Sequence, residues 1–201
     1  PDGVLVTNHH VLDRDATSGF VVMTSAGEVR EVREVLAADR VSDVALVRVD
    51  TGGREVPCLP LRAGAPVGTP VWVLGHSGQN YFLFTQGIVA RRAISDRGTG
   101  AAVPWLQITA EYARGASGAP VLDATGAVVG VVSRTDSVHA DERTRQDLQM
   151  VLRFCAPTSA LLSLVEPPPA VEAPAEGGGS EPPPDRGAPG DPSPEAPGGG
   201  G

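Results

Sequence analysis

The feature that most constrains the fold of this chain is a succession of short strand-like runs separated by turn residues. Each run is a few residues long, rich in aliphatic side chains, and bounded by glycine, proline or short polar residues. Many short strands with little helix are typical of an all-β barrel or sandwich. The runs cover residues 4–6, 20–23, 28–36, 43–49, 67–74, 81–85, 87–92, 105–109, 121–122, 127–133 and 148–155.

One helix is expected after the last of these runs. Ala156, Pro157 and Thr158 form a helix start signal, and a short apolar stretch follows as far as Val165. The sequence therefore predicts an all-β domain that ends with a short helix over residues 158–165.

The composition changes abruptly after this helix. Residues 166–201 hold 11 prolines and 9 glycines, with Val171 as the only aliphatic side chain larger than alanine. Such a segment cannot bury enough apolar surface to offset the entropy of ordering it, so we expect a disordered tail or linker. Most of the formal net charge of −8 lies in this tail. The remainder is nearly neutral, which argues against a nucleic-acid partner.

Two cysteines, Cys58 and Cys155, fit no metal-ligand spacing, and their pairing is left open. No apolar run is long enough to predict a membrane span. No signal peptide is recognised either, but the start at Pro1, Asp2 and Gly3 has the character of a turn inside a longer protein. Neither a metal nor an organic cofactor is expected.

A serine between two glycines, Gly115-Ala116-Ser117-Gly118, is the candidate reactive group. The same pattern also occurs in ordinary turns. A nucleophilic serine needs a histidine base and a carboxylate that orients the base. The four histidines are His9, His10, His76 and His139.

The order of the candidate partners is informative. His9 and His10 stand at a strand end, and Asp43 opens a buried strand, with Asp39 as the alternative acid. The order His, Asp, Ser is that of chymotrypsin. An α/β-hydrolase elbow would instead need glycine where Ala119 stands.

Three segments together resemble the catalytic motifs of trypsin-like serine proteases, closest to the bacterial HtrA/Deg branch. They are Thr7-Asn8-His9-His10-Val11, Asp43-Val44-Ala45-Leu46-Val47 and Gly115-Ala116-Ser117-Gly118-Ala119-Pro120. The resemblance covers residues 1–165. It implies two six-stranded-type antiparallel β-barrels, over about residues 1–62 and 63–156, the first of them truncated at its N-terminus.

The resemblance also implies roles for individual residues. His10 becomes the base, Asp43 its orienting acid and Ser117 the nucleophile, while the backbone N–H groups of Gly115 and Ser117 form the oxyanion hole. His9 is expected to face away, because adjacent strand residues point to opposite faces.

Substrate contacts follow from the same resemblance. The strand over residues 129–133 is expected to pair with the substrate backbone. Glu111, Ser133 and Arg134 are the candidate substrate-binding residues. Glu111 lies where trypsin has the base of its specificity pocket, with a surface glutamate as the alternative.

Two departures from the family pattern are Ala116, in place of Asn or Asp, and Ala119, in place of Gly. An alanine at 119 would be strained if that residue needed a positive φ. The predicted function is a serine endopeptidase acting on protein or peptide substrates. A catalytically inactive module that binds extended peptides is the alternative, and an esterase is a third. The resemblance implies an extracytoplasmic location, and the oligomeric state is left open.

Overall fold

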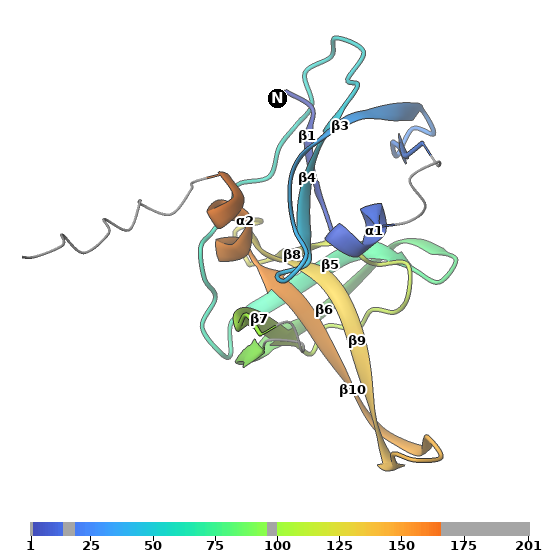
Figure 1. The fold of residues 1–201 in the computed structure, drawn as a ribbon, viewed down its shortest axis with the longest axis vertical. Coiled ribbons are helices and arrows are strands. Elements are labelled where there is room, and N and C mark those ends of the chain that lie inside the picture. The colour runs from blue at the N-terminus through green and yellow to red at the C-terminus, as the bar shows by residue number, and fades with distance from the viewer. Residues whose placement is uncertain (1, 14–18, 96–99, 166–201) are drawn as a thin grey trace, which may run out of the picture. The chain divides into compact units, whose positions relative to one another are not determined.

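A computed structural model describes residues 2–13, 19–95 and 100–165, and the predicted disordered tail lies outside them. The all-β prediction is confirmed: an antiparallel four-stranded sheet is followed by a closed six-stranded barrel (Figure 1). In chain order the elements are β1 (Val4–Thr7), α1 (His9–Leu12), β2 (Val21–Met23), β3 (Val29–Asp39), β4 (Val44–Val49), β5 (Pro70–Ser77), β6 (Asn80–Ser95), β7 (Val103–Ile108), β8 (Pro120–Leu122), β9 (Val128–Asp141), β10 (Gln146–Pro157) and α2 (Thr158–Val165).

The first sheet has the strand order β1-β4-β3-β2 and is open. Its central strand, β4, is the apolar run predicted to be buried, and residues 44–47 of it are indeed buried. β3 is bent by two register shifts against β4, after Val32 and after Val35. These bulges explain why the alternation of polar and apolar residues in this run does not follow one face.

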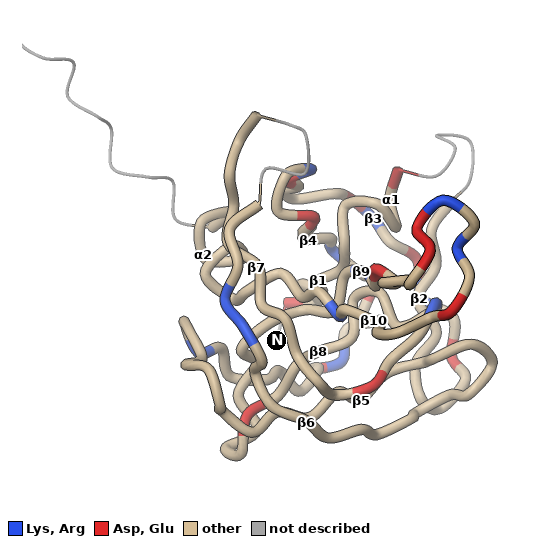
Figure 2. Tube along the Cα trace, turned by 90° about the horizontal axis from the view of Figure 1, so that it is seen from below, with Lys and Arg blue, Asp and Glu red and all other residues tan. Residues whose placement is uncertain are grey.

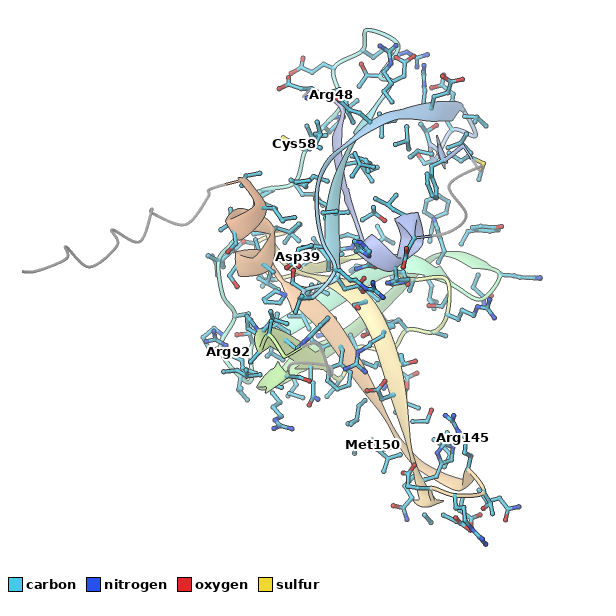
Figure 3. All side chains as sticks on the ribbon, viewed as in Figure 1. Asp39, Arg48, Cys58, Arg92, Arg145 and Met150 are labelled. Carbon is cyan, nitrogen blue, oxygen red and sulfur yellow. The ribbon has the colours of Figure 1, made fainter. Side chains whose placement is uncertain are left out.

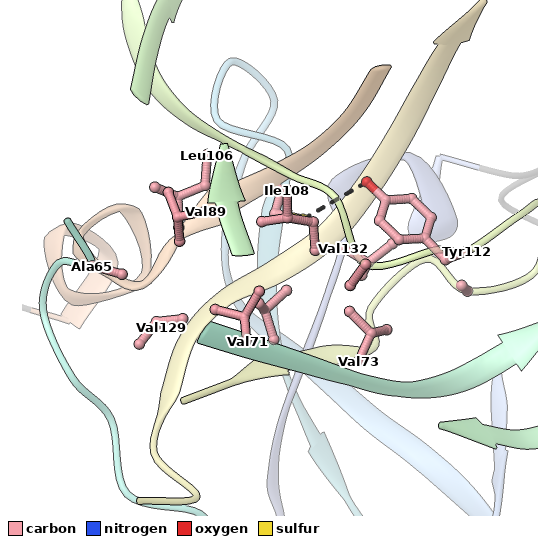
Figure 4. Close-up of a cluster of buried hydrophobic side chains, with 13 residues drawn as sticks. Ala65, Val71, Val73, Val89, Leu106, Ile108, Tyr112, Val129 and Val132 are labelled. Carbon is pink, nitrogen blue, oxygen red and sulfur yellow. Dashed lines mark hydrogen bonds between the residues drawn. The ribbon is translucent and has the colours of Figure 1, made fainter. Parts of the chain in front are cut away.

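The barrel has the strand order β10-β7-β6-β5-β8-β9 and closes on itself. Its interior is filled by a cluster of buried residues that includes Val71, Val73, Val89, Val129 and Tyr112 (Figure 4). The predicted runs 81–85 and 87–92 are one continuous strand, β6, because Gln86 pairs in the same ladder as its neighbours.

A second buried cluster joins the sheet to the barrel. Val44 and Leu46 of β4 meet Trp105 and Phe154 of the barrel, and Leu161 of α2 packs among them. The predicted C-terminal helix is confirmed as α2, and its Thr158 hydroxyl donates a 2.9 Å hydrogen bond to the Val128 carbonyl.

Strands β9 and β10 continue beyond the barrel as a two-stranded arm, residues 134–153 (Figure 1). Arg145 and Met150 lie toward its far end (Figure 3). The sequence predicted one strand ending at residue 133 and the next beginning at residue 148. The part of the arm between them was not predicted, because the arm lacks an apolar face. Acidic and basic residues are interspersed along the described chain (Figure 2).

Candidate active site

His10 lies on the single-turn helix α1, not in the strand end predicted from the sequence. Asn8 is the N-cap residue of this helix and is fully buried. Its side-chain amide donates a 2.9 Å hydrogen bond to the backbone carbonyl of Asp43. The His10 N–H donates to the Asp43 carboxylate at 3.0 Å. The start of α1 is thereby fixed to the start of β4.

His10, Asp43 and Ser117 form one hydrogen-bonded chain. The His10 Nδ1 lies 2.8 Å from the Asp43 Oδ2, and the His10 Nε2 lies 3.0 Å from the Ser117 Oγ. The Asp43 side chain is 5% exposed, whereas that of His10 is 46% exposed. A carboxylate at Nδ1 selects the tautomer with its proton there, which leaves Nε2 free to accept the serine proton.

Asp43 occupies an unusual backbone conformation, with φ at 57°. Left-handed backbone is uncommon outside glycine, although aspartate tolerates it better than most residues. The conformation is supported on three sides, by Asn8, by His10 and by the Ser133 hydroxyl, which donates to the Asp43 carboxylate. Ser133 therefore supports the Asp43 carboxylate directly, a contact that its sequence context did not reveal.

The alternative acid, Asp39, is occupied elsewhere. Its carboxylate accepts hydrogen bonds from the N–H groups of Val41 and Ser42 and from the Ser42 hydroxyl. Burial alone would raise the pKa of Asp39, but these hydrogen bonds outweigh it and hold the pKa below the ordinary value. Asp39 thus closes the turn before β4. His9 is half-buried. Both histidines lie in α1, so their side chains point in different directions because successive helical residues are rotated about the helix axis, not because strand residues alternate between faces.

The Ser117 loop lies between β7 and β8 and is tied to β9. The Gly118 N–H donates to the Val132 carbonyl at 3.0 Å, and the Val132 N–H donates to the Ala119 carbonyl at 2.9 Å. Gly118 has a φ of 86°, whereas Ala119 is absent from the described residues with positive φ. The alanine at 119 is therefore accommodated without the backbone strain considered from the sequence.

The peptide between Arg114 and Gly115 has a defined orientation. The Gly78 N–H donates a 2.7 Å hydrogen bond to the Arg114 carbonyl, and no described peptide bond is cis. In a planar trans peptide the N–H points opposite to the carbonyl, so the Gly115 N–H points away from Gly78. Among the described residues, neither this N–H nor that of Ser117 donates a hydrogen bond.

Gly115 is required by its surroundings. Its φ is 103°, and a Cβ placed on it would lie 2.8 Å from the His76 carbonyl oxygen. Both the backbone conformation and the contact exclude a side chain without movement of the loop.

The predicted substrate-binding residues are dispersed. The Glu111 side chain is 81% exposed and pairs with Arg153 at 3.3 Å. Arg134 pairs with Asp136 and stacks over the Phe154 ring, 4.0 Å from its centroid. Only Ser133 adjoins Ser117, with its carbonyl oxygen 3.4 Å from the Ser117 Oγ.

Tyr112 is a residue of this region that the sequence did not single out. It is buried, and its hydroxyl lies 2.9 Å from the Phe154 carbonyl and 3.1 Å from the Arg134 carbonyl. Burial raises the pKa of Tyr112, so the hydroxyl stays protonated and can donate to either oxygen. It holds the Ser117 loop against β9 and β10. The residue types flanking it gave no signal of this role.

Both cysteines are free thiols, Cys58 exposed and Cys155 buried. Burial raises the pKa of the Cys155 thiol to about 12. Within the described ranges, no group of three or more His, Cys, Asp or Glu side chains could hold a metal ion. The helices described are too short to cross a bilayer.

A closed antiparallel barrel beside a second antiparallel sheet, with a histidine, an aspartate and a serine joined between them, is the arrangement of chymotrypsin-like proteins. Comparison with known proteins agrees. A family model for the trypsin-like peptidase domain matches residues 1–131. The chain belongs to the trypsin-like peptidase family, in its HtrA/Deg branch.

Individual relatives support this placement. The chain is 34% identical over 170 residues to the uncharacterized protein y4bJ of Sinorhizobium fredii, covering 80% of this chain and 25% of the relative. A probable periplasmic serine endoprotease, DegP-like, of Pseudomonas fluorescens is 31% identical over 137 residues, covering 66% and 27%. The chain thus spans about a quarter of the length of these curated relatives.

Solved structures agree on the fold. The HtrA-type protease AlgW, solved with a decapeptide, matches with a TM-score of 0.66 at 20% identity, over 82% of this chain and 49% of AlgW. At this identity the likeness shows the fold alone.

Proposed function

We propose that residues 1–165 are the catalytic domain of a serine endopeptidase that hydrolyses peptide bonds through an acyl-enzyme on Ser117. The observation that carries the proposal is the hydrogen-bonded chain from Asp43 through His10 to Ser117, with links of 2.8 and 3.0 Å. These distances lie within the range required of a nucleophile and its base.

Acylation begins when the His10 Nε2 accepts the proton of the Ser117 hydroxyl as the Oγ attacks the carbonyl carbon of the scissile bond. The imidazolium that forms is stabilised by the Asp43 carboxylate at Nδ1. The tetrahedral intermediate collapses as its C–N bond breaks, and His10 gives its proton to the departing amine. Water then repeats the sequence on the acyl-enzyme, with His10 again as base and then as acid, and Ser117 is regenerated.

The oxyanion of each intermediate is assigned to the N–H groups of Gly115 and Ser117. Support comes from the Arg114 carbonyl, whose bond to Gly78 turns the following N–H away from that turn. A single donor of this kind contributes about 10²- to 10³-fold in kcat.

Of the candidate substrate-binding residues, we assign a contact to Ser133 through its backbone carbonyl. The side chains of Glu111 and Arg134 are engaged with Arg153 and Asp136, which argues against a primary role in side-chain selection. An extracytoplasmic location is proposed from the relative named as periplasmic.

The test is a Ser117→Ala variant of the full-length protein. Casein cleavage and labelling by a fluorophosphonate probe are both expected to disappear, because the probe needs the same activated hydroxyl. A Ser25→Ala variant, changed at an exposed turn in the first sheet, is the matched control and keeps both. Labelling that survives in Ser117→Ala would sink the proposal.

A non-catalytic peptide-binding module is the second candidate, motivated by Ala116 and Ala119. Ala119 has no positive φ, and Ala116 is buried within the barrel cluster, so neither disturbs the loop. Peptide binding without hydrolysis by the folded full-length protein would favour this candidate. Comparing turnover of matched peptide and ester substrates separates a peptidase from an esterase.

A further inference from the structure

The turn between β5 and β6 supports the Ser117 loop. The Gly78 N–H donates to the Arg114 carbonyl at 2.7 Å, and the buried Ser77 accepts an N–H of the same loop at its hydroxyl, at 3.1 Å. The Arg114 carbonyl and the Gly115 N–H belong to one planar peptide. The direction of the Gly115 N–H, which is one of the two donors assigned to the oxyanion, therefore depends on the position of this turn.

A bulge shapes the turn. Two residues of β6, Tyr81 and Phe82, lie opposite the single residue His76 of β5. Phe82 has a φ of 58°, in the left-handed region that a bulky side chain rarely adopts. Such a conformation persists only where surrounding contacts hold it.

The His76 ring provides these contacts. The Phe82 N–H donates a 3.0 Å hydrogen bond to the His76 Nδ1. The same ring meets the rings of Tyr81 and Phe82 edge to face, with centroids 5.2 and 4.9 Å away. The His76 carbonyl oxygen also faces the Ser117 loop, because a Cβ placed on Gly115 would lie 2.8 Å from it. His76 thus contacts both the bulge and the peptide that carries the oxyanion donor.

The hydrogen bond from Phe82 defines the protonation state of His76. An imidazole nitrogen accepts a hydrogen bond only when it carries no proton, so the ring is neutral with its proton on Nε2. This is the opposite tautomer to that of His10, in which Nδ1 carries the proton. In an imidazolium both nitrogens are donors, and the Nδ1–H would face the Phe82 N–H. A second proton on His76 therefore breaks the hydrogen bond that holds the bulge.

The surroundings of His76 do not compensate a positive charge. The titratable and charged groups on the two elements packed against it are Tyr81 on β6 and Glu111, Tyr112 and Arg114 on the Ser117 loop. The Glu111 carboxylate pairs with an arginine of β10, and the Tyr112 hydroxyl bonds backbone carbonyls of β9 and β10. Within the described ranges, no ion pair joins His76 to a carboxylate. Histidine is the type of side chain that changes charge between about pH 5 and 8, so mild acid is the relevant signal.

We propose that neutral His76 is a positioning residue for the oxyanion donor at Gly115, and that protonation of its ring switches the site off. The inference rests on the proposed endopeptidase function. Loss of the Phe82 hydrogen bond lets the left-handed residue relax, the turn shifts, and the bond from the turn to the Arg114 carbonyl is lost. This switch acts on the donor and is separate from the protonation of His10, which removes the base itself.

Two substitutions separate the nitrogen of His76 from its ring. His76→Asn places a side-chain oxygen near the position of Nδ1, as an acceptor that takes up no proton, but it lacks the ring. His76→Phe keeps a ring beside Tyr81 and Phe82 and has no acceptor. At about pH 7.5, His76→Asn is expected to keep kcat for a casein-derived peptide within about threefold, whereas His76→Phe loses at least about tenfold in kcat with KM nearly unchanged. Equal activity of the two variants, or the reverse order, would overturn the proposal.

The pH profile tests the protonation step. Protonation of His10 lowers kcat/KM equally in the wild type and in His76→Asn, so it cancels in their ratio. Between about pH 7.5 and 5, the ratio of His76→Asn to wild type is expected to rise by about tenfold or more, because only the wild type also loses the oxyanion donor. His139→Asn, changed on the arm, is the matched control, and its ratio to wild type stays constant. A ratio for His76→Asn that does not change with pH overturns the proposal.

Amide resonances report on the turn without catalysis. In the full-length Ser117→Ala protein, the nitrogen-15 resonances of the Phe82 and Gly78 amides are expected to shift on acidification with one common midpoint. Neither shifts in the same protein carrying His76→Asn. A Phe82 resonance that shifts while that of Gly78 stays fixed would show that the bulge does not move the turn, and would overturn the proposal. Fluorophosphonate labelling of the wild type at neutral pH tests the endopeptidase function separately, so the two failures are distinguishable.

Discussion

The two halves of this domain differ in how completely their sheets are closed. The barrel of β5 to β10 returns on itself around a filled interior. The sheet of β1 to β4 is open, and an apolar cavity of about 720 Å³ lies against it, lined in part by Val6, Val22, Leu46 and Leu161. The same antiparallel pairing thus gives one half a packed core and the other an accessible apolar face.

The candidate site is divided between these halves. Ser117 and its loop belong to the closed barrel, whereas His10 and Asp43 belong to the open sheet. The cluster of Val44, Trp105 and Leu161 holds the halves together. The difference teaches that Ser117 is positioned by the closed barrel, while His10 depends on hydrogen bonds to Asp43 within the open half and meets the barrel at Ser117. The predictions below probe that dependence.

Asp43→Asn is expected to have the largest effect. An amide in place of the carboxylate can favour the wrong His10 tautomer and cannot stabilise the imidazolium. In a triad of this type kcat falls by about 10⁴-fold. Steady-state cleavage of a casein-derived peptide measures it, and Asp39→Asn is the matched acid-to-amide control that keeps the rate within about twofold, because Asp39 bonds only its own turn. A fall of less than tenfold for Asp43→Asn would remove the acid from the proposed mechanism.

Gly115→Ala tests the barrel side of the site. Because the new methyl meets the His76 carbonyl at 2.8 Å, the peptide that aims the oxyanion donor must move. The expected loss in kcat is about 10²- to 10³-fold, with His10 and Ser117 unchanged. Gly126→Ala is the control: its φ of 79° is comparable, but its Cβ meets nothing within 4 Å. If both variants slow the reaction equally, backbone strain in general and not the donor is responsible.

The closed and open halves also predict different costs for the same truncation. Val71 is 0% exposed inside the barrel, whereas Val21 of β2 is 62% exposed. Val71→Ala is expected to lower the free energy of unfolding by about 2 kcal/mol, through lost burial and the cavity left behind. Val21→Ala is expected to cost less than about 0.5 kcal/mol. Urea unfolding measures both. Equal costs would show that another surface covers the edge of the open sheet in solution.

Sequence reasoning located the strands and the three candidate catalytic residues because each depends on a local pattern. His10, Asp43 and Ser117 stand in short motifs that follow one another in the order His, Asp, Ser, and hydrogen bonds join His10 to each of the other two. Helix α1 was missed because four residues are too few for a periodic pattern. The different directions of the His9 and His10 side chains were therefore attributed to strand alternation and not to a helix.

Features that depend on contacts between residues remote in the chain could not be predicted from the sequence. The outer part of the arm was missed because residues 134–141 and 146–147 are mostly polar, and pairing between β9 and β10, not an apolar face, holds them as strands. Asn8 and Tyr112 act through backbone carbonyls remote in sequence, at Asp43 and Phe154. No local residue pattern predicts such a remote hydrogen-bond partner. The closure of one half and the openness of the other follow from strand pairing that sequence periodicity does not specify.

The smallest expected effect separates the two acids that the sequence placed before β4. Asp39→Asn weakens the charge-assisted hydrogen bonds to Val41 and Ser42 and is expected to cost about 1 kcal/mol at neutral pH. The pKa of Asp39 is lowered in the folded state, so its stabilisation is present above the unfolded value of about 3.9 and is lost as the pH falls through the folded value. The difference in urea-unfolding free energy between wild type and Asp39→Asn should therefore be largest near neutral pH and vanish in acid. A difference that grows on acidification would mean that Asp39 is stabilised in its protonated form. The hydrogen bonds of the turn would then not account for the Asp39 carboxylate being held away from His10, which is bonded by Asp43.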